Sequence, residues 1–413
     1  MLEPLSSVVD TALVGHYDTS SLAALAVGST MMGAFTWMFN FLVHAPVQSI
    51  SEAQGNGDQA KVHSLTKLSL LISFGLSFIL ILLILPFKDY LYTFMEVDAE
   101  VRKSCDDYFT VRVLGHFGVL AYTVMLSVLR GLARVNIAFL IVTISTLVNV
   151  ILSYFALYHS DLGLGGVALA TVFSNFLGFC IGFYKYLSIT QSEIPFWGAA
   201  KKVNVLKEFS SKSLNIFGRS FVLTSCFFLS TKAASSIGKI DLASHQIILQ
   251  VWLFASFFTD GLATSGSIIG GRLFKEDKVS LYKTFKKLLM MGVQIGLIFT
   301  ILFYFFKHQL LSLFTSDEKV IQTISDIWTF IALVQVPMSV AYVYDGLIFG
   351  INRFDYLRKQ MMIGFFVSFV PFLYLSFIYK SLYYIWVALF AIGIYRLISN
   401  YFCIRSEFKI REA

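Results

Sequence analysis

Hydrophobic residues occur in long runs that short charged or turn-rich stretches separate. A helix needs about 20 apolar residues to cross a bilayer core of about 30 Å, because each residue advances about 1.5 Å. Eleven such runs lie near 22–50, 64–87, 105–129, 136–158, 163–187, 210–236, 242–270, 285–306, 320–349, 358–380 and 382–404, and residues 1–17 resemble the second part of a twelfth. Polar and apolar residues do not alternate within runs such as Leu76–Leu85, so the pattern predicts helices and not membrane-spanning strands.

Composition supports an all-α integral membrane protein. Of the 413 residues 57% are hydrophobic and only 14% are charged, and the mean hydropathy is +0.73. An ordinary soluble domain is about 45–50% apolar and about 25% charged. These values exclude a soluble globular protein, a disordered chain and a collagen-like repeat. Four cysteines are also too few for a disulfide scaffold of this length.

Basic residues predict the orientation in the membrane. If the C-terminus is cytoplasmic, 21 of the 32 Lys and Arg residues fall on the cytoplasmic side, 8 fall on the opposite side, and Arg112, Arg219 and Arg396 lie within spans. This bias follows the positive-inside rule, and twelve spans then place both termini in the cytoplasm. The net charge of +7 therefore indicates basic loops and not nucleic-acid binding. Residues 1–20 lack a basic stretch, so we expect no cleavable signal peptide.

The two halves of the chain repeat one hydropathy pattern. At an offset of 220 residues, Leu22-Ala23 falls on Leu242-Ala243 and Ala121-Tyr122 falls on Ala341-Tyr342. Six spans in each half give both halves the same orientation, so a pseudo-two-fold axis along the membrane normal relates them, as in many secondary transporters. We expect an N-terminal lobe over 1–187, a cytoplasmic linker over 188–208 and a C-terminal lobe over 209–413.

Three acidic residues lie within the predicted spans: Asp10, Asp260 and Asp345. An aspartate at mid-helix costs about 2.5–3.5 kcal/mol on insertion scales, so such a residue has a function or a partner. Each has Thr, Tyr or Gly neighbours and could face a polar cavity, where it would bind and release H⁺ or Na⁺. The alternatives are a structural ion pair with Arg112, Arg219 or Arg396, or a position near a helix end.

For Asp260 and Asp345 both interpretations stay open, whereas ion coupling is favoured for Asp10. Asn149, Ser153 and Thr171 support this assignment, because they form a polar cluster in the fifth and sixth spans. Asn149 and Ser153 are four residues apart and therefore share one helix face. We take Asp10, Asn149, Thr171 and Ser153 as the predicted ion-coupling site.

The sequence lacks the motifs of ATP-driven, metal-dependent or enzymatic chemistry. It contains no P-loop, and its seven histidines and four cysteines show no metal-ligand spacing. No loop is long enough for a catalytic domain. We therefore expect neither an enzyme nor a cofactor nor a metal, and an ion gradient as the energy source. Aromatic residues make up 16% of the chain, and those that line a cavity would suit flat cationic substrates.

Several motifs resemble the multidrug and toxic compound extrusion (MATE) family, and its DinF-like branch in particular. They are Val9-Asp10-Thr11-Ala12-Leu13-Val14-Gly15-His16, Leu22–Ala26, Leu129–Leu132, Asn149, Gly165–Thr171, Asp260-Gly261 and Asp345–Gly350. The resemblance covers nearly all of the chain. It implies twelve helices in two six-helix lobes around a central cleft, and export of amphipathic or cationic drugs or toxic metabolites in exchange for H⁺ or Na⁺.

The resemblance also implies site residues. The essential first-helix carboxylate of the family matches Asp10, and its Asn and Thr partners match Asn149 and Thr171. Two departures stand out. Ser153 occupies a position where many relatives carry an aspartate, which leaves a two-carboxylate site in question, and the first helix is shorter than in relatives.

From these observations we expect an antiporter of the plasma (inner) membrane that functions as a monomer. Its partners would be a small amphipathic substrate, H⁺ or Na⁺ and the lipid bilayer, with H⁺ favoured by the branch it resembles. One alternative is a lipid-linked oligosaccharide flippase, whose basic cleft would need Arg112, Arg219 or Arg396. Others are an inactive shortened transporter or a membrane-embedded enzyme, which would need a His/Asp or metal site.

Overall fold

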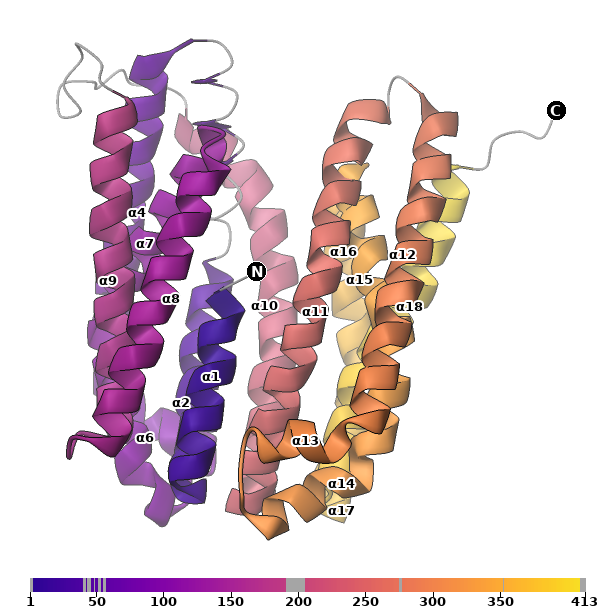
Figure 1. Cartoon of the computed structure of the whole chain (residues 1–413). Coiled ribbons are helices and arrows are strands. Elements are labelled where there is room, and N and C mark those ends of the chain that lie inside the picture. The colour runs from indigo at the N-terminus through magenta and orange to yellow at the C-terminus, as the bar shows by residue number, and fades with distance from the viewer. Residues whose placement is uncertain are drawn as a thin grey trace.

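The chain folds into helices that stand side by side in two groups (Figure 1). The structure, a computed structural model, describes residues 3–39, 42, 46–47, 49–50, 53–54, 57–190, 205–274, 277–351 and 353–408. Every regular element in these ranges is a helix. The expected all-α fold is therefore confirmed.

The N-terminal lobe is built on α8 and α9, which pack along each other, with α7 against α9, α2 against α6 and α1 against α8. Its elements are α1 (Glu3–Tyr17), α2 (Thr19–Met38), α4 (Gln59–Ile84), η1 (Leu85–Phe87), α5 (Lys88–Phe94), α6 (Ala99–Leu114), α7 (His116–Gly131), α8 (Val135–Tyr158) and α9 (Gly163–Ile189). The 15 residues of α1 rise about 22 Å, which is less than the bilayer core.

The C-terminal lobe is built around α15, which packs against α11, α12 and α18. Its elements are α10 (Val205–Ile237), α11 (Lys239–Leu273), α12 (Lys278–Phe305), α13 (Lys307–Ser312), α14 (Glu318–Leu333), α15 (Gln335–Gly350), α16 (Phe354–Gly364), the π-helical η2 (Phe365–Phe369), α17 (Val370–Tyr379) and α18 (Leu382–Glu407). Residues 191–204 of the predicted linker lie outside the described residues.

The described helices group into twelve long helical segments, with the short α13 apart from them. Seven helical stretches are long and apolar enough to span a membrane, and two bent pairs raise this number to nine among the described residues. The bent pairs are α6 with α7, at 52°, and α14 with α15, at 55°. α1, α2 and α10 complete the twelve. The predicted spans 105–129 and 320–349 are therefore each broken near the middle.

Small residues let α15 approach α11 closely. Gly346 and Gly350 lie one turn apart on α15, and they face Ala263 and Gly270 of α11. A Cβ atom added to Gly346 would lie 2.2 Å from the carbonyl oxygen of Ala263, and one added to Gly350 would lie 3.0 Å from the Cα atom of Gly270. Close backbone contact through glycines is a common way to join helices in membranes. The contact holds α15, which carries Asp345, against α11.

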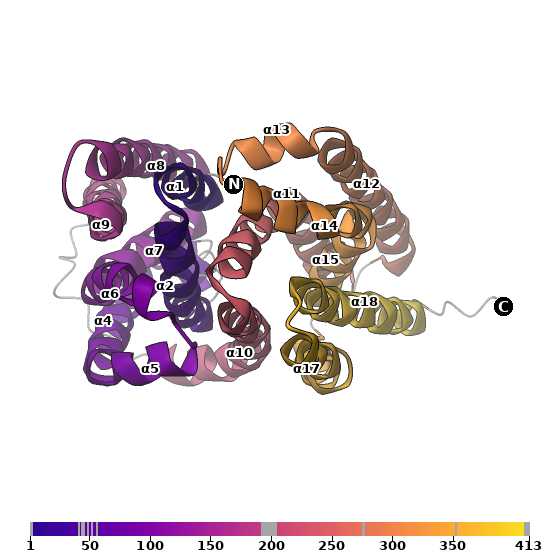
Figure 2. The same cartoon turned by 90° about the horizontal axis from the view of Figure 1, so that it is seen from below.

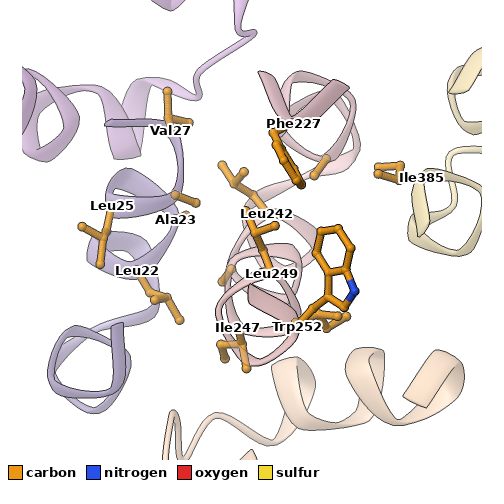
Figure 3. Close-up of a cluster of buried hydrophobic side chains, with 14 of the residues drawn as sticks. Leu22, Ala23, Leu25, Val27, Phe227, Leu242, Ile247, Leu249, Trp252 and Ile385 are labelled. Carbon is orange, nitrogen blue, oxygen red and sulfur yellow. The ribbon is translucent and has the colours of Figure 1, made fainter. Parts of the chain in front are cut away.

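The two lobes meet along α1 and α2 on one side and α10 and α11 on the other (Figure 2). One hydrophobic cluster runs across this interface. In Figure 3, Leu22 and Ala23 of α2 face apolar side chains of α10 and α11, including Leu242 and Leu249.

Polar contacts between the lobes gather at the end opposite the C-terminus, which we call the closed end. The Lys239 ammonium contacts both carboxylate oxygens of Glu100 at 2.8 Å. The Thr19 hydroxyl donates to Asp317 at 2.7 Å, and this bond keeps the pKa of the Asp317 carboxyl below its ordinary value. Among the described residues, no hydrogen bond or ion pair joins the lobes at the other end.

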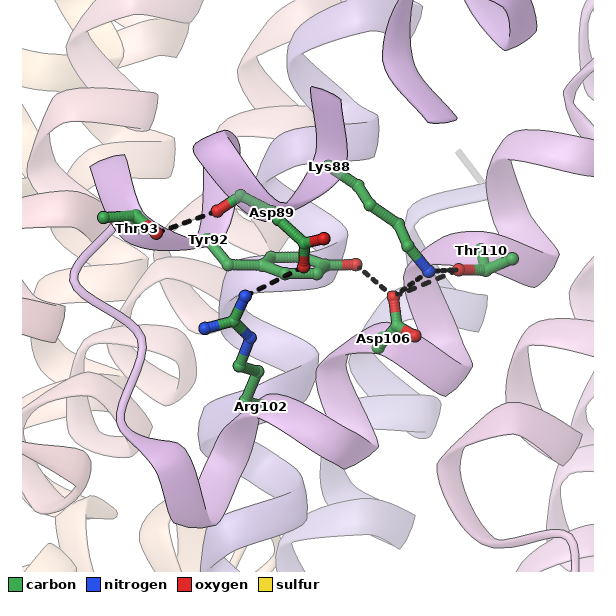
Figure 4. Close-up of polar contacts among 7 residues, drawn as sticks. All are labelled: Lys88, Asp89, Tyr92, Thr93, Arg102, Asp106 and Thr110. Carbon is green, nitrogen blue, oxygen red and sulfur yellow. Dashed lines mark hydrogen bonds and ion pairs between the residues drawn. The ribbon is translucent and has the colours of Figure 1, made fainter. Parts of the chain in front are cut away.

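A polar network within the N-terminal lobe supports the closed end (Figure 4). The Lys88 ammonium lies 2.6 Å from an Asp106 oxygen, which also accepts a bond of 2.9 Å from the Tyr92 hydroxyl. Arg102 pairs with Asp89 at 2.8 Å. These contacts fix α5 against α6, so the segment that carries Glu96 and Glu100 is anchored to the lobe.

Candidate functional site: a cavity between the lobes

A cavity with a water-accessible volume of about 420 Å³ lies between the lobes. Residues of α1, α2, α6, α7, α8 and α9 form one wall, and residues of α10 and α11 form the other. The lining is mixed in character. Its polar members are Ser6, Ser7, Asp10, Ser29, Thr30, Thr36, Arg112, Thr123, Ser145, Thr146, Asn149, Thr171, Ser174, Asn175, Thr224, Gln246 and Gln250, and its aromatic members are Tyr108, Tyr122, Phe227, Phe254 and Phe257.

The Asp10 carboxyl lines this cavity and is otherwise buried, with 7% of the residue exposed. α1 carries it between α8 of its own lobe and α11 of the other. The Ser153 side chain lies beside the carboxyl, and Arg112 is near enough to act on it electrostatically. Even so, Asp10 Oδ1 and Ser153 Oγ make no hydrogen bond with any described residue. The carboxyl therefore has spare capacity to bind a cation.

The predicted polar cluster lies around the Asp10 carboxyl. Asn149 Nδ2 donates to Thr171 Oγ1 at 3.2 Å, and the Ser6 hydroxyl donates to Asn149 Oδ1 at 2.5 Å. Ser6 lies one turn before Asp10, so α1 contributes two groups to one network. The structure thus brings Asp10, Asn149, Ser153 and Thr171 together, while their role in ion coupling stays a prediction.

Asp345, the first of the secondary candidates, lies outside the cavity and is fully engaged. Arg219 Nη2 lies 2.5 Å from Asp345 Oδ2, Arg396 binds the same oxygen, and Asn400 Nδ2 donates to Oδ1 at 2.6 Å. These partners come from α10 and α18, so the network joins three helices of the C-terminal lobe. The arrangement matches the ion-pair alternative for Asp345.

Asp260, the third acidic residue within the predicted spans, differs from both Asp10 and Asp345. Its side chain on α11 is exposed and does not line the cavity. Arg219, Arg396 and Asp345 are close enough to act on it electrostatically, but none forms an ion pair with it. No described group of three or more His, Cys, Asp or Glu residues could hold a metal ion.

Arg112 is a cavity residue that the sequence alone does not distinguish from the other arginines within spans. We considered it beside Arg219 and Arg396 as an ion-pair partner or a phosphate ligand. Arg219 and Arg396 are committed to Asp345, whereas Arg112 lines the cavity. In the sequence, all three arginines are charged residues within a predicted span. Only the folded structure distinguishes Arg112 from Arg219 and Arg396.

Two lobes of six crossing helices, with a mixed polar and aromatic cavity between them, define an integral membrane transporter. The sequence matches the family described as MatE over residues 1–155 and 216–375. The chain belongs to the MATE family of multidrug and toxic compound efflux transporters. The resemblance found in the sequence motifs is therefore confirmed at the level of the family.

Individual relatives are distant and cover most of the chain. Protein DETOXIFICATION 44, chloroplastic, of Arabidopsis thaliana is 25% identical over 383 residues, which are 89% of this chain and 72% of the plant protein. DNA damage-inducible protein F of Escherichia coli (strain K12) is 23% identical over 368 residues, or 87% and 80% of the two chains. A solved multidrug resistance MATE family transporter in an inward-facing conformation superposes with a TM-score of 0.87, at 18% identity, over 98% of this chain and 96% of that one.

Proposed function

We propose that the protein is a secondary active antiporter that exports small amphipathic molecules, such as cationic drugs or toxic metabolites, in exchange for H⁺ or Na⁺. It would do so in the plasma (inner) membrane, with both termini in the cytoplasm. The observation that carries the proposal is the Asp10 carboxyl, which lines the cavity between the lobes with one oxygen lacking a partner.

Cation binding at Asp10 would affect the polar groups around its carboxyl. Oxygen ligands suit Na⁺ as well as a proton, and the carboxyl has the Ser153 hydroxyl beside it and the Ser6–Asn149–Thr171 network nearby. Neutralising the carboxyl changes the field on Arg112 and the packing of α1 between the lobes. The cation can shift the conformational equilibrium only by its difference in affinity for the two states.

The distribution of contacts supports a cavity that opens towards the cytoplasm. Hydrogen bonds and ion pairs between the lobes gather at the closed end, and the bias of basic residues predicts that this end faces the outside of the cell. The solved relative with the TM-score of 0.87 is in an inward-facing conformation. In our proposal the lobes 1–187 and 209–413 move as units that the segment 188–208 connects.

A flippase for lipid-linked oligosaccharides fits less well. Such a protein holds a pyrophosphate, which carries several negative charges and calls for a cluster of basic groups. Among the described residues that line the cavity, Arg112 is the single basic side chain. One guanidinium opposite one carboxyl favours a small substrate with few charges.

The test is the replacement Asp10→Asn, which keeps the shape of the side chain and removes its charge. We expect it to abolish dye efflux driven by a cation gradient in proteoliposomes, with cationic and zwitterionic rhodamines as probes. Imposing a pH gradient and a Na⁺ gradient separately identifies the ion. Asp326→Asn is the matched control, because Asp326 is exposed on α14. Full gradient-driven efflux by the Asp10→Asn variant would reject the assignment.

A further inference from the structure

Two ionisable side chains of opposite type line the cavity. Among the described lining residues, Asp10 on α1 is the acidic one and Arg112 on α6 is the basic one. They are close enough to interact electrostatically, yet no nitrogen of Arg112 lies within ion-pair range of Asp10. The cavity therefore presents a carboxyl and a guanidinium that are not joined in an ion pair.

Arg112 has no polar partner of its own. It makes no hydrogen bond or ion pair with the residues that the structure describes, and its Nε is buried without a partner. Its one specific neighbour is Tyr108, whose ring centre lies 5.8 Å from the guanidinium carbon. Tyr108 is held in turn against Gly28 of α2, where an added Cβ atom would lie 2.6 Å from the ring. The guanidinium is thus positioned by packing and left unpaired.

An unpaired guanidinium within a membrane is costly, and such residues usually mark a ligand or ion site. The other two arginines within spans show the contrast, since Arg219 and Arg396 share the Asp345 carboxyl. Arginine presents planar N–H donors that match the two oxygens of a carboxylate. An anionic group with two oxygens would therefore complete the environment of Arg112.

We propose that Arg112 is a specificity-determining residue that binds an anionic group of the transported molecule, so that the preferred substrate is a zwitterionic amphipath. The inference rests on the proposed function. The cationic centre of the substrate would compete with the coupling ion at Asp10, which is what exchange requires. Its carboxylate would bind Arg112, and its apolar body would lie among aromatic residues such as Tyr122, Phe227 and Phe254.

The test compares two dyes that share one ring system. Rhodamine B carries a free carboxylate and is zwitterionic at neutral pH, whereas rhodamine B ethyl ester is a cation. Fluorescence anisotropy with the purified full chain in nanodiscs measures the binding of each. We expect the wild type to bind the zwitterion about tenfold more tightly than the ester, as one hydrogen-bonded charge pair allows.

Variants assign the preference to one side chain. Arg112→Gln should weaken binding of the zwitterion about tenfold without weakening binding of the ester, so binding of the ester also shows that the variant is folded. Arg112→Lys keeps the charge without the fork of donors and should restore part of the preference. Arg134→Gln is the control, because Arg134 is exposed and lies outside the cavity.

The outcomes separate this inference from the proposed function. It is overturned if the wild type fails to bind the zwitterion, if it binds the ester at least as tightly, or if Arg112→Gln weakens both dyes equally. Gradient-driven efflux of the ester with no preference for the acid would leave the antiporter intact and remove the role of Arg112. If the zwitterion binds in a way that depends on Arg112 but is not exchanged for a cation, the role of Arg112 is kept and the antiporter is rejected.

Discussion

Asp10 and Asp345 are both buried aspartates within crossing helices, and their surroundings differ in kind. Asp345 binds two guanidinium groups and an amide, whereas Asp10 Oδ1 has no described partner and lines a cavity. A carboxylate that is saturated by arginines is poorly suited to take up a further cation. We therefore assign a structural role to Asp345 and keep ion coupling for Asp10.

This contrast predicts a loss of stability when Asp345 is replaced and little change when Asp10 is replaced. Asp345→Asn leaves Arg219 and Arg396 buried without their counter-charge, and breaking a buried pair in this way costs about 3–5 kcal/mol. We expect a clearly lower unfolding temperature in detergent for Asp345→Asn. Asp10→Asn and the exposed Asp326→Asn should unfold close to the wild type. A wild-type unfolding temperature for Asp345→Asn would contradict the structural role.

At the scale of residues, the sequence predicts the surroundings of Asp10 but not those of Asp345. Asn149 and Ser153 share a helix face by their spacing, and the motif around Asp10 supplied the link to them through the family resemblance. The partners of Asp345 could not be chosen, because Arg219 lies 126 residues away along the chain. Only the packing of α10 and α18 around α15 brings the three residues together.

At the scale of elements, the two bent spans are the main departure from the predicted helices. The breaks fall at Gly115, between α6 and α7, and at Val334, between α14 and α15. These positions differ by about the repeat offset, so the two halves share the bend as well as the hydropathy. Pro337 explains the second break, because it has no N–H to donate to the carbonyl of Leu333.

Span lengths could be read from hydropathy because the bilayer thickness sets them, whereas bends depend on single bonds within an apolar run. The span predicted over 358–380 shows the same limit. It contains the π-helical η2, and Pro371 follows directly in α17, where its missing N–H relaxes the regular bonding. Hydropathy averages over such positions and cannot detect them.

The closed end depends on how nearly α1 approaches the segment before α14. A Cβ atom at Gly15 would lie 1.9 Å from the carbonyl oxygen of Phe314. We expect Gly15→Ala to separate the lobes there, measured as longer distances between spin labels on α2 and α14. Gly75→Ala is the control, since a Cβ atom at Gly75 meets nothing within 4 Å. Unchanged distances in Gly15→Ala would show that this contact does not set the spacing.

On the scale of the whole molecule, the lobes are joined at the closed end by pairs that water can reach. The side chains of Lys239 and Glu100 are 38% and 62% exposed, and a solvent-exposed ion pair contributes little to stability. Contacts this weak hold one state without making it permanent, which would suit the proposed exchange, in which the same end opens in each cycle.

Reversing the charges tests that role. Glu100→Lys places two cations together and should shift the lobes towards separation at the closed end, and Lys239→Glu should do the same with two anions. The double exchange restores the attraction and should recover wild-type label distances. Because the pair is exposed, the effect of each single variant should shrink as salt rises. Additive single effects in the double variant would show that the two residues do not act as a pair.

In the proposed exchange, Arg112, the one arginine among the described residues of the cavity wall, bears on the energetics of the cycle. A substrate whose charges cancel carries none outward, while the returning proton or sodium ion brings one positive charge in. Each turnover is then electrogenic, and the membrane potential contributes about 2.3 kcal/mol per 100 mV. Export would continue with equal ion concentrations on both sides, whereas a monovalent cationic drug exchanged one for one would gain nothing from the voltage.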